Sequence, residues 1–373
     1  MMPLAQRLAA RIRAEGPLRF DAFQEAALYD PEGGYYERAG RVGRAGDFVT
    51  GPSWHPAFGR TIARIARRLG LADIVDVGAG EGELLSAAGA ALEAWGIRDR
   101  FRLTGIERSA VRRAKAAEMC PGADWLPSFE EIPRGSLSGL IVCYELFDAL
   151  PVRALLFEGE KLLERVVTLV RGGEGGPGGE DPDSFEWSLA ECVDGAELLD
   201  RFRRRGIHLR RNQKLEIRAG APRLARALAE RLEQGLLLVF DYGAPARALY
   251  SAARPNGTLE AFLAHGVTRD VLTEPGSRDL TAWVDFSEVA EAFTAAGLSV
   301  SGPVSQSRVL AAGGIFEDIA FDSTGPLDAG READRRAAAA LVQPGGMGES
   351  IRVLIASRDT ALGSALASWT RPA

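Results

Sequence analysis

The sequence contains few of the residues that build metal sites and disulfide frameworks. Its 373 residues include only three cysteines and three histidines. They are scattered along the chain, as Cys120, Cys143 and Cys192 and as His55, His208 and His265. An odd number of separated cysteines does not favour a disulfide framework or a zinc site, and no two histidines stand at metal-ligand spacing. We therefore expect a protein that holds no metal.

Long apolar runs and an excess of positive charge are also missing. No apolar run approaches the roughly 20 residues that a membrane-spanning helix needs. The chain has 45 lysines and arginines against 51 aspartates and glutamates, whereas general nucleic-acid-binding proteins are usually basic. The N-terminal arginines could suggest a transit peptide, but Leu4, Leu8 and Ile12 have the spacing of an ordinary surface helix. We expect a cytoplasmic protein with no membrane span and no nucleic-acid partner.

A glycine-rich stretch is the most informative part of the chain. The β-branched run in residues 74–77 predicts a buried strand. Gly78, Gly80 and Gly82 follow, and from Leu85 onward apolar residues recur with a helical period. A strand, a glycine turn and a helix in this order bring the polar group of a ligand against bare backbone and a helix N-terminus. The stretch predicts a site for a small polar ligand.

The details of this turn favour one ligand over another. The dinucleotide fingerprint needs a third glycine at position 83, which is Glu83 here. Instead an acid, Asp76, lies at the strand end, and a second acid, Glu107, closes the next strand-like run. This pattern is similar to the S-adenosylmethionine site of class I methyltransferases. A glycine turn that binds no ligand, and an NAD-dependent oxidoreductase, are the alternatives.

Further strands extend the same pattern. Residues 139–148 and 236–243 are apolar runs that contain or end in acidic residues. Strands that alternate with helices predict an α/β fold with a doubly wound, Rossmann-like parallel sheet, in which ligands bind beyond the carboxyl ends of the strands. The acids expected at this edge are Asp76, Glu107, Glu145 and Asp148.

Four segments are predicted along the chain. Residues 1–55 form an N-terminal extension of helices and loops that covers the cofactor. Residues 56–150 form the Rossmann-like half that binds it. Residues 151–235 are an insertion over the substrate cleft, with a hairpin, a mobile Gly/Pro-rich loop and helices, and mainly helical overall. Residues 236–373 complete the sheet and add C-terminal elements.

Short motifs along the whole chain resemble one family. They are Ala27–Pro31 with Gly34–Tyr36, Gly46–Thr50, Asp76–Gly80, Glu145–Val152, Asp241–Gly243, Gly257–Leu259, Asp279–Ala282 and Met347–Glu349. With these residues in this order, the chain resembles the MidA-like class I methyltransferases, which include the mitochondrial complex I assembly arginine methyltransferase and its bacterial relatives. The resemblance implies transfer of a methyl group from S-adenosylmethionine.

The resemblance and the positions after the strands together give a set of cofactor residues. They are Asp47, Thr50, Asp76, Gly78, Ala79, Gly80, Gly82, Glu107, Phe129 and Tyr144. The glycine turn would face the methionine part, and Glu107 would accept from the ribose hydroxyls. For Phe129 an ordinary core position is an equal alternative, and Glu107 could be a solvated acid at a strand end.

The methyl acceptor is the open question. An arginine guanidinium, whose pKa lies above about 12, would need carboxylates to hold it and to accept its proton. We assign this catalytic role to Glu145 and Asp148, with Asp47 and Asp241 in support; the alternative is that Glu145 and Asp148 only cap a turn. The family typically has an acid at Ser53 and an asparagine at Tyr144, so the acceptor pocket is where this chain departs from it.

Three functions follow from these residues. The first is a methyltransferase that acts on a protein side chain, with arginine as the candidate. The second is a methyltransferase for a small molecule, with residues 171–235 as its lid. The third is an assembly factor that keeps the cofactor pocket but does not catalyse. The sequence leaves a homodimer open.

Overall fold

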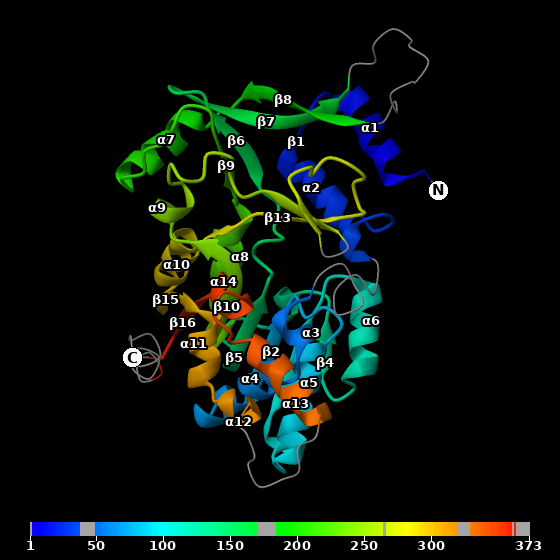
Figure 1. The fold of residues 1–373 in the computed structure, drawn as a ribbon, viewed down its shortest axis with the longest axis vertical. Helices are drawn as coiled ribbons and strands as arrows, with labels where there is room; N and C mark the ends of the chain where they lie inside the picture. The colour runs from blue at the N-terminus through cyan, green and yellow to red at the C-terminus, as the bar shows by residue number, and fades with distance from the viewer. Residues whose placement is uncertain are drawn as a thin grey trace. The chain divides into compact units, whose positions relative to one another are not determined.

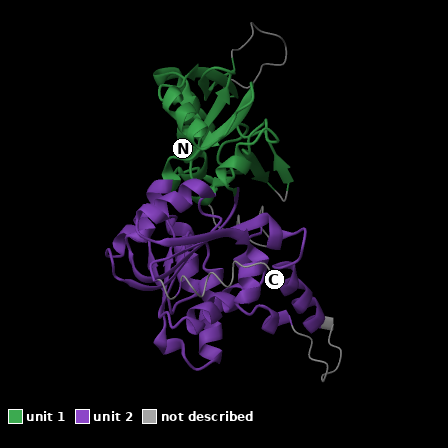
Figure 2. Ribbon diagram, turned by 90° about the vertical axis from the view of Figure 1, so that its left-hand side faces the viewer, with its two compact units in different colours: residues 1–38, 148–221, 244–285 green, residues 39–147, 222–243, 286–373 purple. Residues whose placement is uncertain are grey.

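The structure is a computed structural model that describes residues 2–37, 49–170, 184–263, 266–319, 329–359 and 362. The chain divides into two compact units (Figure 2). Unit 1 comprises residues 1–38, 148–221 and 244–285, and unit 2 comprises residues 39–147, 222–243 and 286–373. Each unit is therefore built from three separate stretches of the chain.

Unit 2 is organised around one large sheet with the strand order β15-β16-β10-β5-β2-β3-β4 (Figure 1). Its strands are β2 (Asp73–Val77), β3 (Arg102–Ile106), β4 (Asp124–Leu126), β5 (Leu137–Tyr144), β10 (Leu232–Ala244), β15 (Ser299–Ser305) and β16 (Ile351–Ser357). The five strands from β10 to β4 are parallel, and β16 runs antiparallel to both β10 and β15. The predicted doubly wound α/β sheet is confirmed.

The register of this sheet brings the strand ends together. Val77, the last residue of β2, pairs with Ile106 of β3 on one side and with Cys143 of β5 on the other. Tyr144 at the end of β5 pairs with Phe240 of β10. We call this side, where β2, β3 and β5 end, the carboxyl edge. Because parallel strands end on the same side, the residues that follow each of them gather there.

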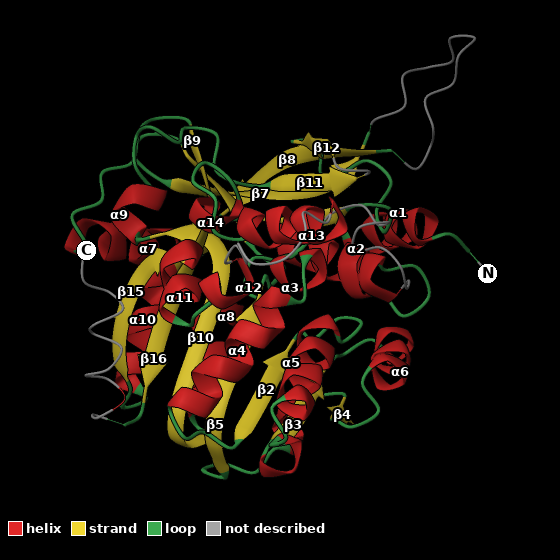
Figure 3. Cartoon of the chain, turned by 60° about the horizontal axis from the view of Figure 1, so that its bottom comes forward, coloured by secondary structure: helices red, strands yellow, loops and turns green. Residues whose placement is uncertain are grey.

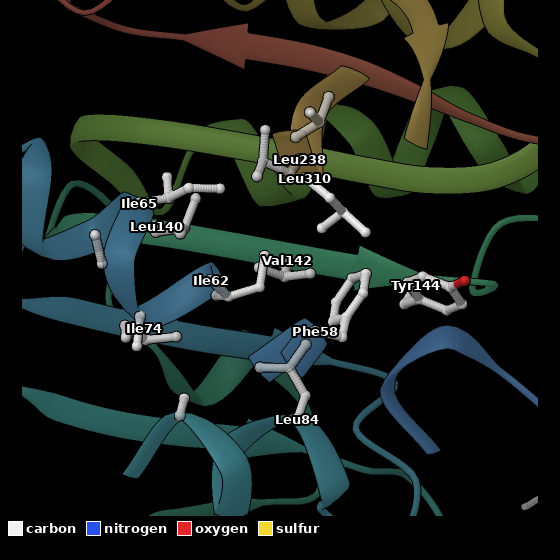
Figure 4. Close-up of a cluster of buried hydrophobic side chains, with 14 of the residues drawn as sticks. Phe58, Ile62, Ile65, Ile74, Leu84, Leu140, Val142, Tyr144, Leu238 and Leu310 are labelled. Atoms are coloured by element: carbon white, nitrogen blue, oxygen red, sulfur yellow. The ribbon is translucent and has the colours of Figure 1, made fainter. Parts of the chain in front are cut away.

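Helices pack on the sheet of unit 2, with α4 and α5 crossing its strands (Figure 3). The helices of this part are α3 (Gly51–Trp54), α4 (Ala57–Arg68), α5 (Glu83–Ala94), η2 (Arg98–Arg100), α6 (Ala110–Met119), η3 (Phe129–Glu131), α8 (Gly220–Ala229), α10 (Phe286–Ala295), α11 (Gln306–Ala312), α12 (Phe316–Ile319), α13 (Ala329–Ala340) and α14 (Met347–Ser350). Phe58, Ile62 and Ile65 of α4 are fully buried against strand residues such as Leu140 and Val142 (Figure 4). This apolar layer fixes the strands whose ends form the carboxyl edge.

Unit 1 contains two smaller antiparallel sheets. The first has the order β1-β7-β6-β9, with β8 paired to β7, and the second has the order β12-β11-β13. The elements here are α1 (Leu4–Glu15), β1 (Leu18–Arg19), α2 (Phe20–Tyr29), η1 (Tyr35–Glu37), β6 (Arg153–Phe157), β7 (Leu162–Leu169), β8 (Phe185–Glu191), α7 (Gly195–Arg204), β9 (Gln213–Ile217), α9 (Ala246–Leu249), β11 (Glu260–Leu263), β12 (Gly266–Thr268), β13 (Asp279–Thr281) and β14 (Val284–Asp285). The predicted hairpin within residues 151–170 is confirmed as β6 and β7.

The prediction that residues 151–235 are mainly helical is wrong. The described part of this insertion holds four strands, β6 to β9, and only the helices α7 and α8. The missed signal is an alternation of large apolar residues, Phe185, Trp187 and Leu189, which is typical of a strand. The Trp187 ring lies 5.1 Å from that of Phe20 and 3.9 Å from the Arg165 guanidinium. The predicted mobile loop falls almost wholly on residues 171–183, outside the described residues.

Among the helices in the described part of the chain, none has both the length and the apolar character that crossing a membrane requires.

Candidate active site

The glycine turn after β2 is held by backbone hydrogen bonds to the neighbouring strand. The Gly78 and Ala79 N–H groups both donate to the Ile106 carbonyl, at 2.9 and 3.0 Å. Gly78, Gly80 and Gly82 all have positive φ, and Gly82 caps the N-terminus of α5 in a left-handed conformation. Only glycine adopts three such conformations in one turn without strain. The turn therefore starts α5 directly at the carboxyl edge.

The glycines also allow other parts of unit 2 to approach the turn. A Cβ at Gly80 would lie 2.9 Å from the Arg112 guanidinium, and one at Gly78 would lie 2.9 Å from the Leu146 side chain. A Cβ at Gly82 would meet Trp125 at 3.0 Å. These neighbours are mostly side-chain ends, so the positive φ of the three glycines is the stronger reason for glycine at these positions.

Glu107 joins the end of β3 to the glycine turn. Its Oε2 accepts from the Gly80 N–H at 3.0 Å, and its Oε1 accepts from the Ser109 N–H at 2.8 Å. The side chain is buried, which does not fit the alternative of a solvated acid at a strand end. Each carboxylate oxygen has two lone pairs, so each can accept one further hydrogen bond. Glu107 is therefore placed to receive donors from a ligand at the turn.

Asp76 and Glu83 add two more acids beside Glu107. Burial, together with the negative charges of Glu83 and Glu107, raises the pKa of Asp76 to about 8. Burial likewise raises the pKa of Glu83, the first residue of α5. Three carboxylates close together in a buried place are stabilised by a positive charge. This charge pattern fits a cationic ligand.

The structure differs in what it shows for three other residues that were predicted to bind the cofactor, Phe129, Thr50 and Asp47. The Phe129 ring lies 5.5 Å from the guanidinium of Arg231. Arg231 directly precedes β10, at the end of the sheet where β10 and β5 begin. Thr50 caps α3, where its Oγ1 accepts from the Ser53 N–H. Asp47 lies outside the described residues.

Tyr144 lies in the core of unit 2. Its ring packs between Phe58 at 5.0 Å and Phe240 at 5.6 Å, as Figure 4 shows for Phe58. Its hydroxyl donates to the Oε1 of Gln306, a fully buried side chain, at 3.0 Å. The structure therefore gives Tyr144 a packing role in this core.

Both departures from the family pattern have a local structural reason. Ser53 completes a capping box with Thr50, since the Thr50 N–H donates to the Ser53 Oγ at 3.0 Å. A serine thus performs the capping function that an acid usually has at this position. At Gly51 a Cβ would lie 2.5 Å from the Tyr144 hydroxyl, so the lack of a side chain at Gly51 leaves room for the Tyr144 ring.

Glu145 and Asp241 lie side by side at the carboxyl edge. Glu145 follows β5 with φ +48°, and its N–H donates to the Phe240 carbonyl at 2.8 Å. Asp241 is fully buried, and its two oxygens accept from the Phe147 and Tyr242 N–H groups, each at 2.9 Å. The carboxylate of Asp241 is thus engaged by backbone donors.

Asp148 belongs to unit 1, where Arg218 binds its main chain. The Arg218 guanidinium donates to the carbonyls of Asp148, Leu150, Ala282 and Trp283 at 2.7 to 3.1 Å. Burial raises the pKa of Asp148 to about 6, and the nearby charge of Arg218 opposes the shift.

Sequence reasoning missed two parts of this region of unit 1. The first is Arg218, for which no motif gave a signal. The second is the Tyr36 hydroxyl, which donates to the Asp279 carboxylate at 2.8 Å. Burial raises the Tyr36 pKa well above its usual range, and the charges of Asp279 and Asp148 add to this shift. Tyr36 and Asp279 both lie in the motifs quoted above for the family resemblance, which was the available signal.

The fold and the site define a class I S-adenosylmethionine-dependent methyltransferase. The glycine turn offers backbone groups, the three acids suit the ammonium and sulfonium of this cofactor, and Glu107 can accept from ribose hydroxyls. The comparisons with known proteins agree. A family model described as an S-adenosyl-L-methionine-dependent methyltransferase matches residues 57–304, and the chain belongs to this family.

Two groups of relatives extend over most of the chain. The mitochondrial protein arginine methyltransferase NDUFAF7 homolog of Drosophila melanogaster is 28% identical over 82% of this chain and 74% of its own length. NDUFAF7 of Rattus norvegicus is 25% identical over 83% and 73%. A crystal structure of a Burkholderia thailandensis protein bound to S-adenosyl-homocysteine has a TM-score of 0.84 and 29% identity, and covers 95% of this chain and 92% of that one. The enzyme is thus a methyltransferase that uses S-adenosylmethionine.

Proposed function

We propose that the methyl acceptor is an arginine guanidinium of a protein substrate, bound by Glu145. The observation that carries this proposal is the acid that directly follows β5. Its backbone is fixed in an unusual conformation at the carboxyl edge. The name of the curated relatives, protein arginine methyltransferase, supports the same acceptor.

The chemistry of the acceptor explains why a carboxylate is needed. S-adenosylmethionine, when bound, supplies the methyl group from its sulfonium. Glu145 would bind the guanidinium through charge-assisted hydrogen bonds and concentrate electron density on the attacking nitrogen. As that nitrogen gains the methyl group it must lose a proton, which the Glu145 carboxylate would accept.

A labelled-methyl transfer assay with a Glu145→Gln variant tests the role of this acid. Transfer of tritiated methyl from S-adenosylmethionine to the proteins of a cell lysate should fall at least about tenfold, since general acid–base groups commonly contribute more than that. Glu160→Gln, an exposed position in the turn between β6 and β7, is the control and should keep the wild-type rate.

Other results of this assay separate the alternatives. Equal transfer by the Glu145→Gln variant and the wild type would contradict a catalytic part for Glu145. Label found in a small molecule other than S-adenosylmethionine, and in no protein, would favour a small acceptor. Binding of S-adenosylhomocysteine without any transfer would favour an assembly factor.

A further inference from the structure

Glu145 is held in a backbone conformation that its side chain disfavours. Its φ of +48° lies in the left-handed region, where residues other than glycine, asparagine and aspartate are uncommon. Such a residue persists only when its surroundings hold it, and residues of this kind cluster at functional sites. The structure must therefore contain groups that impose this turn at the end of β5.

The groups that impose the turn come from β10. The Glu145 N–H donates to the Phe240 carbonyl, and two residues later the Phe147 N–H donates to the Oδ2 of Asp241. The Oδ1 of Asp241 accepts from the Tyr242 N–H, which fixes the carboxylate on its own strand. Asp241 is fully buried, so hydrogen bonds from water do not compete with these contacts. Hydrogen bonds to β10 thus hold the turn at Glu145 itself and again at Phe147.

We propose that Asp241 is a positioning residue for the methyl transfer reaction, which fixes the turn at residues 145–147 and thereby the direction of the Glu145 carboxylate. The inference rests on the proposed function, in which Glu145 binds the acceptor. It also changes the role expected from the sequence, where Asp241 was a supporting acid for the substrate cation. A carboxylate is suited to the positioning task because it accepts from two backbone N–H groups at once and binds them more strongly than a neutral acceptor does.

A double-mutant cycle separates positioning from general stability. Asp241→Asn presents an amide N–H₂ to one of the two backbone donors and should loosen the turn. We expect the rate of tritiated methyl transfer to lysate protein to fall about tenfold, because small misplacements of catalytic groups have effects of this size or larger. The Kd for S-adenosylhomocysteine, measured by calorimetry, should stay within about twofold of the wild-type value. In a Glu145→Gln background, Asp241→Asn should cause no further loss.

A matched control uses another buried aspartate of the same sheet. Asp73 begins β2 at the opposite end from the carboxyl edge, and its oxygens accept from the Ser138 N–H and from Arg102. Asp73→Asn should lower the melting temperature and leave the transfer rate unchanged. If Asp241→Asn does not fold, Asp241→Ser keeps one oxygen acceptor, and the cycle is repeated with it.

The outcomes distinguish the two hypotheses. Suppose that Glu145→Gln lowers the transfer rate, and that adding Asp241→Asn to this variant lowers the rate by the same factor as adding it to the wild type. The positioning role of Asp241 is then overturned, while the role of Glu145 stands. A wild-type rate in Asp241→Asn also overturns it. If Glu145→Gln keeps the wild-type rate, the proposed role of Glu145 fails, and the positioning role fails with it.

Discussion

Replacing Glu107 by alanine should weaken the binding of S-adenosylhomocysteine by about two to four orders of magnitude. The carboxylate is expected to accept from two ribose hydroxyls, and each charged hydrogen bond contributes about 1.5–3 kcal/mol. Their sum of about 3–6 kcal/mol corresponds to about 10²–10⁴ in Kd. The substitution also removes the acceptors of the Gly80 and Ser109 N–H groups, which would loosen the glycine turn.

Calorimetric titration with S-adenosylhomocysteine measures this effect. Glu118→Ala, at an exposed position on α6, is the control and should bind as the wild type does. The affinity of Glu107→Gln should lie between those of Glu107→Ala and the control. The glutamine amide retains one oxygen acceptor but turns its N–H₂ donor towards a second backbone N–H. Wild-type affinity in Glu107→Ala would show that the cofactor does not use this carboxylate.

The second large effect concerns pH and Asp76. Because the pKa of this carboxyl is raised to about 8, it is mostly protonated in the free protein at pH 6. A cationic cofactor favours the ionised form, so its binding should release a proton. Affinity should then rise about tenfold per pH unit from pH 6 towards pH 8 and level off above it. The same shift makes the stability of the free protein fall as the pH rises from 3.8 to about 8.

Two calorimetric measurements test this linkage. Titrations of S-adenosylmethionine in buffers of different ionisation enthalpy report the protons released, which should approach one per cofactor at pH 6 to 7. In Asp76→Asn the affinity should be lower and the slope with pH should disappear, apart from titration of the cofactor itself. Equal affinities of the wild type at pH 6 and pH 8 would refute the assignment of Asp76 to the cofactor.

The parts of the site that could be predicted from the sequence are those fixed by local geometry. The β-branched run and the three glycines determine a strand and a turn with positive φ, and parallel strands bring their ends together. Glu107 could therefore be expected at the same edge of the sheet as the glycine turn, but its hydrogen bond from the Gly80 N–H was not predicted. The carboxyl edge follows from rules that act within a few residues.

Other parts depend on contacts between residues far apart in the chain. The Tyr36 hydroxyl donates a hydrogen bond to Asp279, which is 243 residues later in the chain. The Arg218 guanidinium donates to the Asp148 carbonyl, which is 70 residues earlier. Periodicity reports which face of an element is buried but not which distant residue will meet it. Tyr144 was within reach of such reasoning, because in a strand it shares one face with Leu140 and Val142, both of which lie in the core.

The chemical identity of the methylated product tests the central claim most directly. Lysate protein labelled by the wild-type enzyme with tritiated S-adenosylmethionine is hydrolysed in acid, and its amino acids are separated by chromatography. If Glu145, the acid that follows β5, binds a guanidinium, the label will elute with methylarginine. Label that elutes with another methylated amino acid, or that stays in the small-molecule fraction, would contradict the account.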